Sequence, residues 1–274
     1  MLDTYFAHLP GIGPGATAKL RDAGICCWRD ALDAPELPRG RGLGTGFLEG
    51  VEESLHRLES RDAAWFSERL PASEQWRLFP CFHAGAAFVD IETTGLSRPE
   101  DHITTIALHD GKRLKTYVYG RDLEDFADDI LEYALLVTWN GRCFDAPILR
   151  QALRIPLAHA HLDLLPVYRA LGLRGGLKAV EKKLGLDRGD LDGVDGFMAV
   201  MLWREYRNTG NEKALETLLA YNAEDVLSLE FLARHACFLH GCPVETHAAL
   251  PGNPHTADRT LVERLLRHSR PWYR

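Results

Sequence analysis

Two carboxylates, set two residues apart in an apolar, β-prone segment, constrain this chain more than any other feature. The segment 88–96 reads Phe-Val-Asp-Ile-Glu-Thr-Thr-Gly-Leu, and its apolar run begins at Ala86. Side chains of a strand alternate between two faces, so Asp90 and Glu92 point to the same side. Like charges on a half-buried face repel each other and lose hydration, which favours a bound cation between them. Oxygen ligands suit Mg²⁺ or Mn²⁺, and the alternative is an edge strand with two solvated acids.

A second acidic motif ends at Asp145. It spans residues 139–145, Trp-Asn-Gly-Arg-Cys-Phe-Asp, and comes directly after the apolar run 135–138. A helical pattern of apolar residues starts immediately after it. Asp145 is therefore expected just past the end of a strand and at the start of a helix.

A third motif contains Tyr221 and Asp225 in the sequence Tyr-Asn-Ala-Glu-Asp. Apolar residues continue at helical spacing through Leu232, so the motif is expected to open a helix. Residues four apart share one helix face, which places the phenol one turn from the carboxylate. This arrangement suits a site in which a metal-bound water molecule must be oriented.

In this order and spacing, the motifs resemble the DnaQ-like 3′–5′ exonucleases of the DEDD superfamily, which is named for four acidic residues. The resemblance covers residues 76–239 and assigns the four acids to the positions Asp90, Glu92, Asp145 and Asp225. Tyr221, followed by three residues and then Asp225, fits the Tyr branch of that superfamily, called DEDDy. The surrounding sequence is most similar to the YprB-like ribonuclease-H-like subgroup.

The resemblance implies a metal-dependent 3′–5′ exonuclease that hydrolyses phosphodiester bonds of DNA or RNA. The four acids would hold two Mg²⁺ or Mn²⁺ ions about 4 Å apart, one activating water and the other stabilising the leaving 3′ oxygen. Tyr221 would orient the attacking water, because a phenol with its ordinary pKa near 10 is a poor base at neutral pH. One alternative is a catalytically weak nucleic-acid-binding or scaffolding protein on the same fold. Another is a phosphohydrolase that acts on nucleotides or other small substrates.

The resemblance also implies which residues meet the substrate. Thr93, Thr94 and Leu96 would contact the terminal nucleotide, with Leu96 against its base. Asn140 is a further substrate-binding candidate, although Asn140 and Phe144 are expected mainly to shape the second motif. The partner is a nucleic acid with an accessible 3′ end. The choice between DNA and RNA stays open, because contacts to the 2′-OH depend on loop geometry.

The first segment, residues 8–25, resembles the helix-hairpin-helix motif of DNA-handling proteins. Gly11 and Gly13 are expected to end an incoming helix, Pro14 to begin the next one, and Gly24 to terminate it. The resemblance implies that backbone amides around Gly11 and Gly13 bind phosphates without reading sequence. A small helical packing module is the alternative. The glycine-rich stretch 40–46 does not follow a strand and is expected to be a connector.

The apolar runs predict an α/β fold, namely a ribonuclease-H-like mixed sheet flanked by helices behind a small all-α module. Strands are expected near 86–91, 103–109, 113–119, 135–139 and 159–163, with helices near 122–133, 145–154 and after 164. His161 and Asp163, on the last strand, are expected to bond neighbouring backbone rather than form a catalytic pair. The predicted domains are a helical module at 1–72, an exonuclease domain at 76–240 and a tail with a short basic helix at 241–274, with a hinge near 70–73.

Composition sets further bounds. A net charge of −7 requires that any basic footprint for nucleic acid be local. Candidates are Arg142, Arg150, Arg154 and the segment 258–274, where five arginines outweigh two acids. No apolar run approaches 18 residues and the start lacks a secretory signal, so neither membrane insertion nor secretion is expected. Six cysteines without a Cys-x-x-Cys pair favour reduced thiols and a cytoplasmic location.

Overall fold

A five-stranded mixed sheet forms the centre of the computed structural model, which describes residues 1–95, 100–186, 188, 196–242 and 244. The strand order is β3-β2-β1-β4-β5. The first three strands are antiparallel, whereas β4 and β5 run parallel to β1. The expected mixed sheet is confirmed, with strands β1 (Ala86–Thr93), β2 (Ile103–His109), β3 (Leu114–Val118), β4 (Leu135–Thr138) and β5 (Ala160–Asp163).

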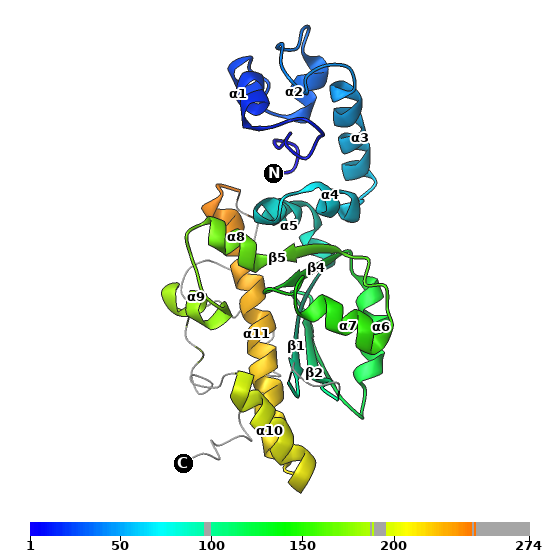
Figure 1. The fold of residues 1–274 in the computed structure, drawn as a ribbon, viewed down its shortest axis with the longest axis vertical. Coiled ribbons are helices and arrows are strands. Elements are labelled where there is room, and N and C mark those ends of the chain that lie inside the picture. The colour runs from blue at the N-terminus through cyan, green and yellow to red at the C-terminus, as the bar shows by residue number, and fades with distance from the viewer. Residues whose placement is uncertain (96–99, 187, 189–195, 243, 245–274) are drawn as a thin grey trace.

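Helices cover both faces of this sheet (Figure 1). Phe88 of β1 packs in one apolar cluster with residues of the long helix α11 (Glu212–Leu239). Its neighbours Val89 and Ile91 point to the other face, where they pack with residues of α7 (Asp145–Leu153). This alternation is what places Asp90 and Glu92 under α11.

Two helix predictions need correction. The single helix expected near 122–133 is instead three short segments, η3 (Leu123–Asp125), α6 (Phe126–Asp129) and η4 (Ile130–Glu132), the outer two being 3₁₀ helices. The shift between 3₁₀ and α geometry keeps Leu123, Phe126 and Ile130, spaced by three and then four residues, on the buried side.

The third motif does not open a helix, because it lies near the middle of α11. The helix begins nine residues before Tyr221, where the side chain of Asn211 accepts a hydrogen bond from the amide of Lys213. Buried Leu215 and Leu218 extend the apolar face ahead of the motif. Preceding α11 on this side of the sheet are α8 (Leu164–Ala170), α9 (Leu177–Lys183) and α10 (Gly196–Thr209).

The N-terminal helices are α1 (Pro14–Asp22), α2 (Trp28–Asp33), α3 (Phe47–Glu59), α4 (Ala63–Arg69), η1 (Ala72–Arg77), α5 (Leu78–Phe82) and η2 (His83–Gly85). Pro14 begins α1, and Gly24 follows its end with φ +79°, both as predicted. The incoming helix before Gly11 was a wrong prediction, because residues 1–13 form only turns. Those turns bury Phe6, Leu9 and Ile12 without a regular helix face.

The N-terminal helices share one apolar core with the sheet. A continuous cluster of buried side chains runs from Leu2 and Trp28 through Phe66 to residues of β1, β4, β5 and α11. The Oγ of Ser67 on α4 accepts a hydrogen bond from the amide of His161 on β5 (2.9 Å). Leu70, at the expected hinge, is itself buried in this core. The predicted basic helix of the tail lies outside the described residues. Across the described part of the chain, no helix has the length and apolar character that crossing a membrane requires.

Candidate metal centre

Three carboxylates meet where β1 passes beneath α11. Asp90 and Glu92 come from the α11-facing side of β1, and Asp225 comes from α11 itself. One ligand oxygen from each carboxylate lies within 4.8 Å of the other two. Asp90 and Glu92 are half-buried and Asp225 is buried, so bulk water screens their mutual repulsion only weakly.

Asp145 stands beside this group at the first position of α7. β4 pairs with β1 only from Ala86 to Phe88, which leaves the amide of Ile91 available beyond the ladder. That amide donates a hydrogen bond to Oδ1 of Asp145 (3.2 Å). Asp145 and Asp90 line the same cavity. The structure therefore places all four predicted acids at one site, with Asp145 outside the closest three.

Burial and mutual repulsion make the charged forms of these carboxylates unfavourable. Burial raises the pKa of Asp90 well above its ordinary value, and the charges of Asp225, Asp145 and Glu92 raise it further. Burial and the charge of Asp225 do the same for the pKa of Glu92. Burial raises the pKa of Asp145 to about 7, although the Ile91 amide opposes the shift. Protons or metal ions can relieve this stored repulsion.

Asn222 fixes the position of Asp90. Its Nδ2 donates hydrogen bonds to Oδ2 (2.8 Å) and to the backbone oxygen (3.2 Å) of Asp90. The hydroxyl of Thr105 on β2 donates to Oδ1 of Asn222 (3.1 Å), which sets the orientation of the amide. This role of Asn222 was not predicted from the sequence, although Asn222 lies directly after Tyr221 in the third motif.

Arg188 links the site to a further buried acid. Its Nη2 forms an ion pair with Oδ1 of Asp225, and its Nε and Nη2 each donate to the carboxylate of Glu181 at 2.7 Å. Burial raises the pKa of Asp225, and the charge of Arg188 lowers it again. Arg188 was not predicted as a site residue, because no motif connects it to Asp225, 37 residues further along the chain.

Tyr221 lines a cavity of about 650 Å³ together with Asp90, Glu92 and Asp225. The ammonium nitrogen of Lys178 lies 4.3 Å from the centre of the Tyr221 ring. Burial raises the pKa of the Tyr221 hydroxyl, and the charge of Asp225 adds to the effect. The phenol is therefore neutral at physiological pH and can donate or accept a hydrogen bond.

The comparisons with known proteins place this site in a family. A family model described as the RNase_H superfamily matches residues 87–237, which contain all three acidic motifs. The chain belongs to the RNase H superfamily. No curated protein matches it.

Among solved structures, the RNase H superfamily chain is similar to the family B DNA polymerase from the hyperthermophilic archaeon Pyrobaculum calidifontis. The sequence identity is 16% and the TM-score is 0.39. The match covers 59% of this chain and 27% of the polymerase, so the chain spans about a quarter of that protein's length.

The predicted substrate residues of this RNase H superfamily protein have different environments. Thr93 lines the same cavity as Asp90, Glu92 and Asp225, just after an irregularity in the β1–β2 pairing. Thr94 is not among the residues that line this cavity. Its hydroxyl donates a hydrogen bond to Asp101 (3.1 Å) and accepts one from the amide of His102 (3.1 Å). Leu96 lies outside the described residues. Asn140 lines the cavity next to Asp90 and Asp145, with its backbone in the left-handed region at φ +62°.

Structural roles account for several polar residues near the second motif. Asp163 accepts hydrogen bonds from the amides of Asn140 (2.8 Å), Arg142 (3.2 Å) and Leu165 (3.1 Å), which confirms that it bonds neighbouring backbone. His161 contacts the Thr138 hydroxyl (2.8 Å), and burial lowers its pKa to about 3. Arg142 donates to the backbone oxygen of His161 (2.8 Å), so its guanidinium braces the fold.

Gly11 and Gly13 do not join the acids. They lie at the start of α1, beyond α4 and α5 and away from the sheet (Figure 1). Gly11 has φ +79°, and a Cβ on Gly42 would come within 2.4 Å of the Gly11 carbonyl oxygen. The glycine-rich stretch 40–46 therefore packs its backbone against the Gly11 turn rather than serving only as a connector.

Proposed function

We propose that this chain is a divalent-metal-dependent 3′–5′ exonuclease of the DEDDy type, similar to the YprB-like subgroup, that hydrolyses phosphodiester bonds of DNA or RNA. The observation that carries the proposal is the convergence of Asp90, Glu92 and Asp225, with Asp145 beside them. Tyr221 supplies a neutral hydroxyl in the same cavity. Membership of the RNase H superfamily supports a nuclease.

The residues fit hard divalent cations. All four candidate ligands are carboxylates, and burial raises the pKa of each, with the charge of Asp225 adding to the effect for Asp90, Glu92 and Asp145. Asp90, Glu92 and Asp225 would hold one Mg²⁺ or Mn²⁺, with Asp90 shared with a second near Asp145. Bound there, the ions would activate water and neutralise charge that develops on the phosphate and the leaving oxygen.

The chain's own side chains would orient the reactants. The Tyr221 hydroxyl would position the attacking water by a hydrogen bond, because its raised pKa prevents it from acting as a base. Lys178, whose ammonium lies against the Tyr221 ring, would add positive charge beside the phosphate. Asn222 would keep Asp90 in place as charge moves through the site.

The N-terminal module would hold the nucleic acid away from the site of cleavage. Gly13 is the N-cap of α1 and has no side chain to accept a hydrogen bond from the first amides of the helix, so these amides would be available to a phosphate. The side chain of Lys19 on α1 reaches the carbonyl of Arg39 (3.0 Å), which places positive charge beside this turn. Such contacts would bind phosphates irrespective of sequence and would weaken as salt is added.

A direct assay tests the proposed activity. Purified protein with Mn²⁺ is incubated with DNA and RNA, single- and double-stranded and labelled at either end, and the products are separated on a denaturing gel. Substrates labelled at the 5′ end should shorten stepwise, and those labelled at the 3′ end should release labelled mononucleotide at once. Binding without cleavage would support the scaffolding alternative instead.

Tyr221→Phe tests the water-orienting role. Losing only the hydroxyl should lower kcat by about 10- to 1,000-fold under single-turnover conditions, as is typical for one positioned polar group. The rise in melting temperature caused by Mn²⁺ should not change, because a neutral phenol is not a metal ligand. Tyr206→Phe is the matched control, since Tyr206 accepts a hydrogen bond from Arg121 (2.7 Å) outside the cavity. An unchanged kcat for Tyr221→Phe would refute the role.

A further inference from the structure

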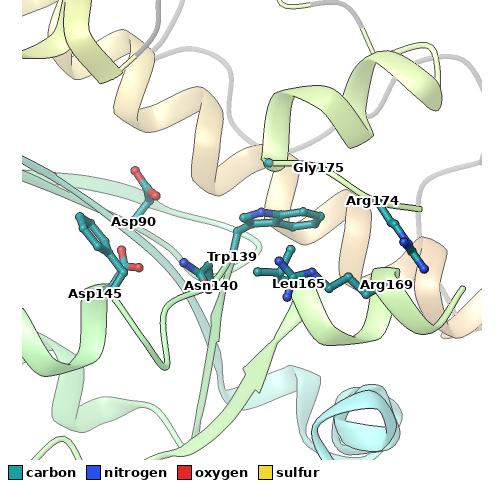
Figure 2. A pocket seen from close by; sticks show the side chains of 10 residues that line it. Asp90, Trp139, Asn140, Asp145, Leu165, Arg169, Arg174 and Gly175 are labelled. Atoms are coloured by element: carbon teal, nitrogen blue, oxygen red, sulfur yellow. The ribbon is translucent and has the colours of Figure 1, made fainter. Parts of the chain in front are cut away.

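A second cavity leads from the metal centre to two arginines (Figure 2). It has a volume of about 760 Å³. Asp90 and Asp145 lie at one end, Arg169 and Arg174 lie at the other, and the indole of Trp139 stands between the two pairs. The two cavities share Asp90, Trp139, Phe144 and Gly176 as lining residues, so a ligand can extend from one into the other.

Both arginines are placed to receive an anion. They are exposed, and neither side chain forms an ion pair or hydrogen bond with another residue in the described part of the chain. Arg169 belongs to α8 and Arg174 to the turn that follows. The backbone carbonyl of Arg174 accepts a hydrogen bond from Lys183 (2.7 Å), which ties this turn to α9. On a chain of net charge −7, two such cations beside an acidic cavity form a local basic footprint.

Trp139 offers a supported aromatic surface between the acids and the arginines. Its ring packs against that of Tyr168, with ring centres 5.7 Å apart. Tyr168 is fully buried, and its hydroxyl donates to the backbone oxygen of Leu232 (3.0 Å). Trp139 itself is only half-buried and lines the cavity. A rigidly backed, accessible indole is a stacking platform for an unpaired base.

We propose that this cavity, the Trp139 groove (Asp90, Trp139, Arg169 and Arg174), binds a single-stranded segment of nucleic acid on the 5′ side of the bond that is cut. One base stacks on Trp139, and Arg169 and Arg174 contact phosphates further from the metal centre. The terminal nucleotide occupies the neighbouring cavity bounded by Tyr221. This inference rests on the proposed nuclease function and adds that the strand must be unpaired next to the cut, since a paired base cannot stack on the indole.

The test compares substrates that do and do not reach the groove. The double variant Arg169→Gln/Arg174→Gln and the single variant Trp139→Leu are assayed with Mn²⁺ on a 12-nucleotide single strand of DNA or RNA. The second substrate is the p-nitrophenyl ester of thymidine 5′-monophosphate, which has no nucleotide on the 5′ side of its scissile bond. The matched control is Arg204→Gln/Arg207→Gln, which removes the same charge from exposed positions on α10.

Both groove variants should raise KM for the 12-mer by about 10-fold or more, and in the double arginine variant, whose residues line only the groove, kcat/KM for the small ester should stay within about 2-fold. The control should match wild type on both substrates. Loss of two phosphate contacts should also make the slope of log affinity against log salt concentration less negative by about 1.4. Unchanged KM for the 12-mer in an active enzyme would overturn the groove and leave the proposed function intact.

Binding without turnover separates the two proposals. Fluorescence anisotropy in Ca²⁺ measures the affinity of wild type and variants for a labelled single strand and for a blunt duplex. Wild type should prefer the single strand, and the double variant should lose about 10-fold in that affinity. A wild type that binds in this way but cleaves nothing would contradict the nuclease proposal alone. Equal affinity for single strand and duplex would overturn the single-strand inference.

Discussion

Arg188 gives the acidic site a cation of its own. It joins Asp225 to Glu181, and the side chains of all three are at most 8% exposed. A buried ion pair loses hydration that its attraction only partly restores, and removing one partner leaves an uncompensated charge. Arg188 therefore favours the ionised form of Asp225 and holds its carboxylate in place, and it would also repel a metal ion that uses the same carboxylate.

Arg188→Gln should separate these two effects. Without metal, the variant should lose about 3–5 kcal/mol of stability, because Glu181 and Asp225 are left without their cation. The rise in melting temperature on adding Mn²⁺ should be larger than in wild type, because the metal then neutralises acids that Arg188 no longer neutralises. Differential scanning fluorimetry over a Mn²⁺ titration measures both.

Arg234→Gln is the matched control, because Arg234 also pairs with a largely buried acid, Glu230 (2.7 Å), which lies outside the acidic cluster. It should lower stability without changing the Mn²⁺ response. A smaller Mn²⁺ response in Arg188→Gln than in wild type would mean that Arg188 mainly positions Asp225 for the metal.

Asp90→Asn tests the repulsion among the acids directly. Burial and three neighbouring carboxylates raise the pKa of Asp90, so its charge destabilises the metal-free fold at neutral pH. The variant should melt at a higher temperature than wild type in EDTA, lose most of the Mn²⁺-induced stabilisation, and lose turnover. Glu59→Gln, at the exposed end of α3, should behave as wild type. A wild type that gains no stability from Mn²⁺ would contradict the metal centre.

At the scale of elements, the strands and turns could be predicted from local sequence patterns, whereas contacts between residues far apart in the sequence could not. The strands were predictable because alternation, turn residues and buried runs are properties of adjacent residues. The Asp110-Gly111 turn is one such case, with the amides of Lys112 and Arg113 bonded to Oδ1 of Asp110. The start of α11 was predicted too late. The prediction began the helix at the motif residue Tyr221, whereas apolar residues at helical spacing already include Leu215 and Leu218.

The same contrast between local patterns and distant contacts applies to the residues of the candidate site. The acids and Tyr221 could be named because each lies in a motif with its own spacing. The roles of Asn222 and Arg188 could not be predicted, because their partners Asp90 and Asp225 lie 132 and 37 residues away in the sequence and only folding brings them together. Arg169 and Arg174 lie in no motif at all. Arg142, predicted as part of a basic footprint, instead turns toward His161 and Ser67.

The helices of the N-terminal module pack around a buried histidine. His8 contacts the rings of Trp28, Trp65 and Phe66, with its Nε2 2.7 Å from the hydroxyl oxygen of Ser54. Burial lowers the pKa of His8 from 6.5 to about 4. The folded protein therefore binds fewer protons than the unfolded chain between these values, and stability falls as the pH drops.

His8→Gln should remove this acid sensitivity. Between pH 7.5 and pH 5, wild type should lose about 2 kcal/mol more than the variant in urea unfolding, as the lowered pKa requires. Using the difference between the two proteins cancels the contributions of other titrating groups, including His161. His56→Gln, at an exposed position on α3, should follow wild type. An identical pH dependence in wild type and His8→Gln would show that His8 is not buried as a neutral ring.

At the scale of the whole molecule, the N-terminal module and the central sheet share one apolar core. Phe66 on α4 is fully buried, and its ring stacks on Trp28 (5.8 Å between centres) on one side and approaches Phe82 (6.4 Å) on the other. The same α4 supplies the Ser67 oxygen that accepts a hydrogen bond from the amide of His161 on β5. Removing residues 1–70 would therefore expose the β5 edge and an apolar surface, so truncation is a poor way to isolate the chemistry.

We predict that the described chain unfolds as one cooperative unit, and Phe66→Ala tests this. The cavity should cost about 3–5 kcal/mol. Pulsed hydrogen exchange with mass spectrometry across a urea gradient should give the same unfolding midpoint for peptides from α2 and from β1–β2. In Phe66→Ala, both midpoints should fall by the same amount, because the shared core transmits the loss. Phe197→Ala, at a position 73% exposed, should leave both unchanged. If only the α2 midpoint falls, the module and the sheet unfold independently, and a cut between them becomes a practical route to the RNase H superfamily domain alone.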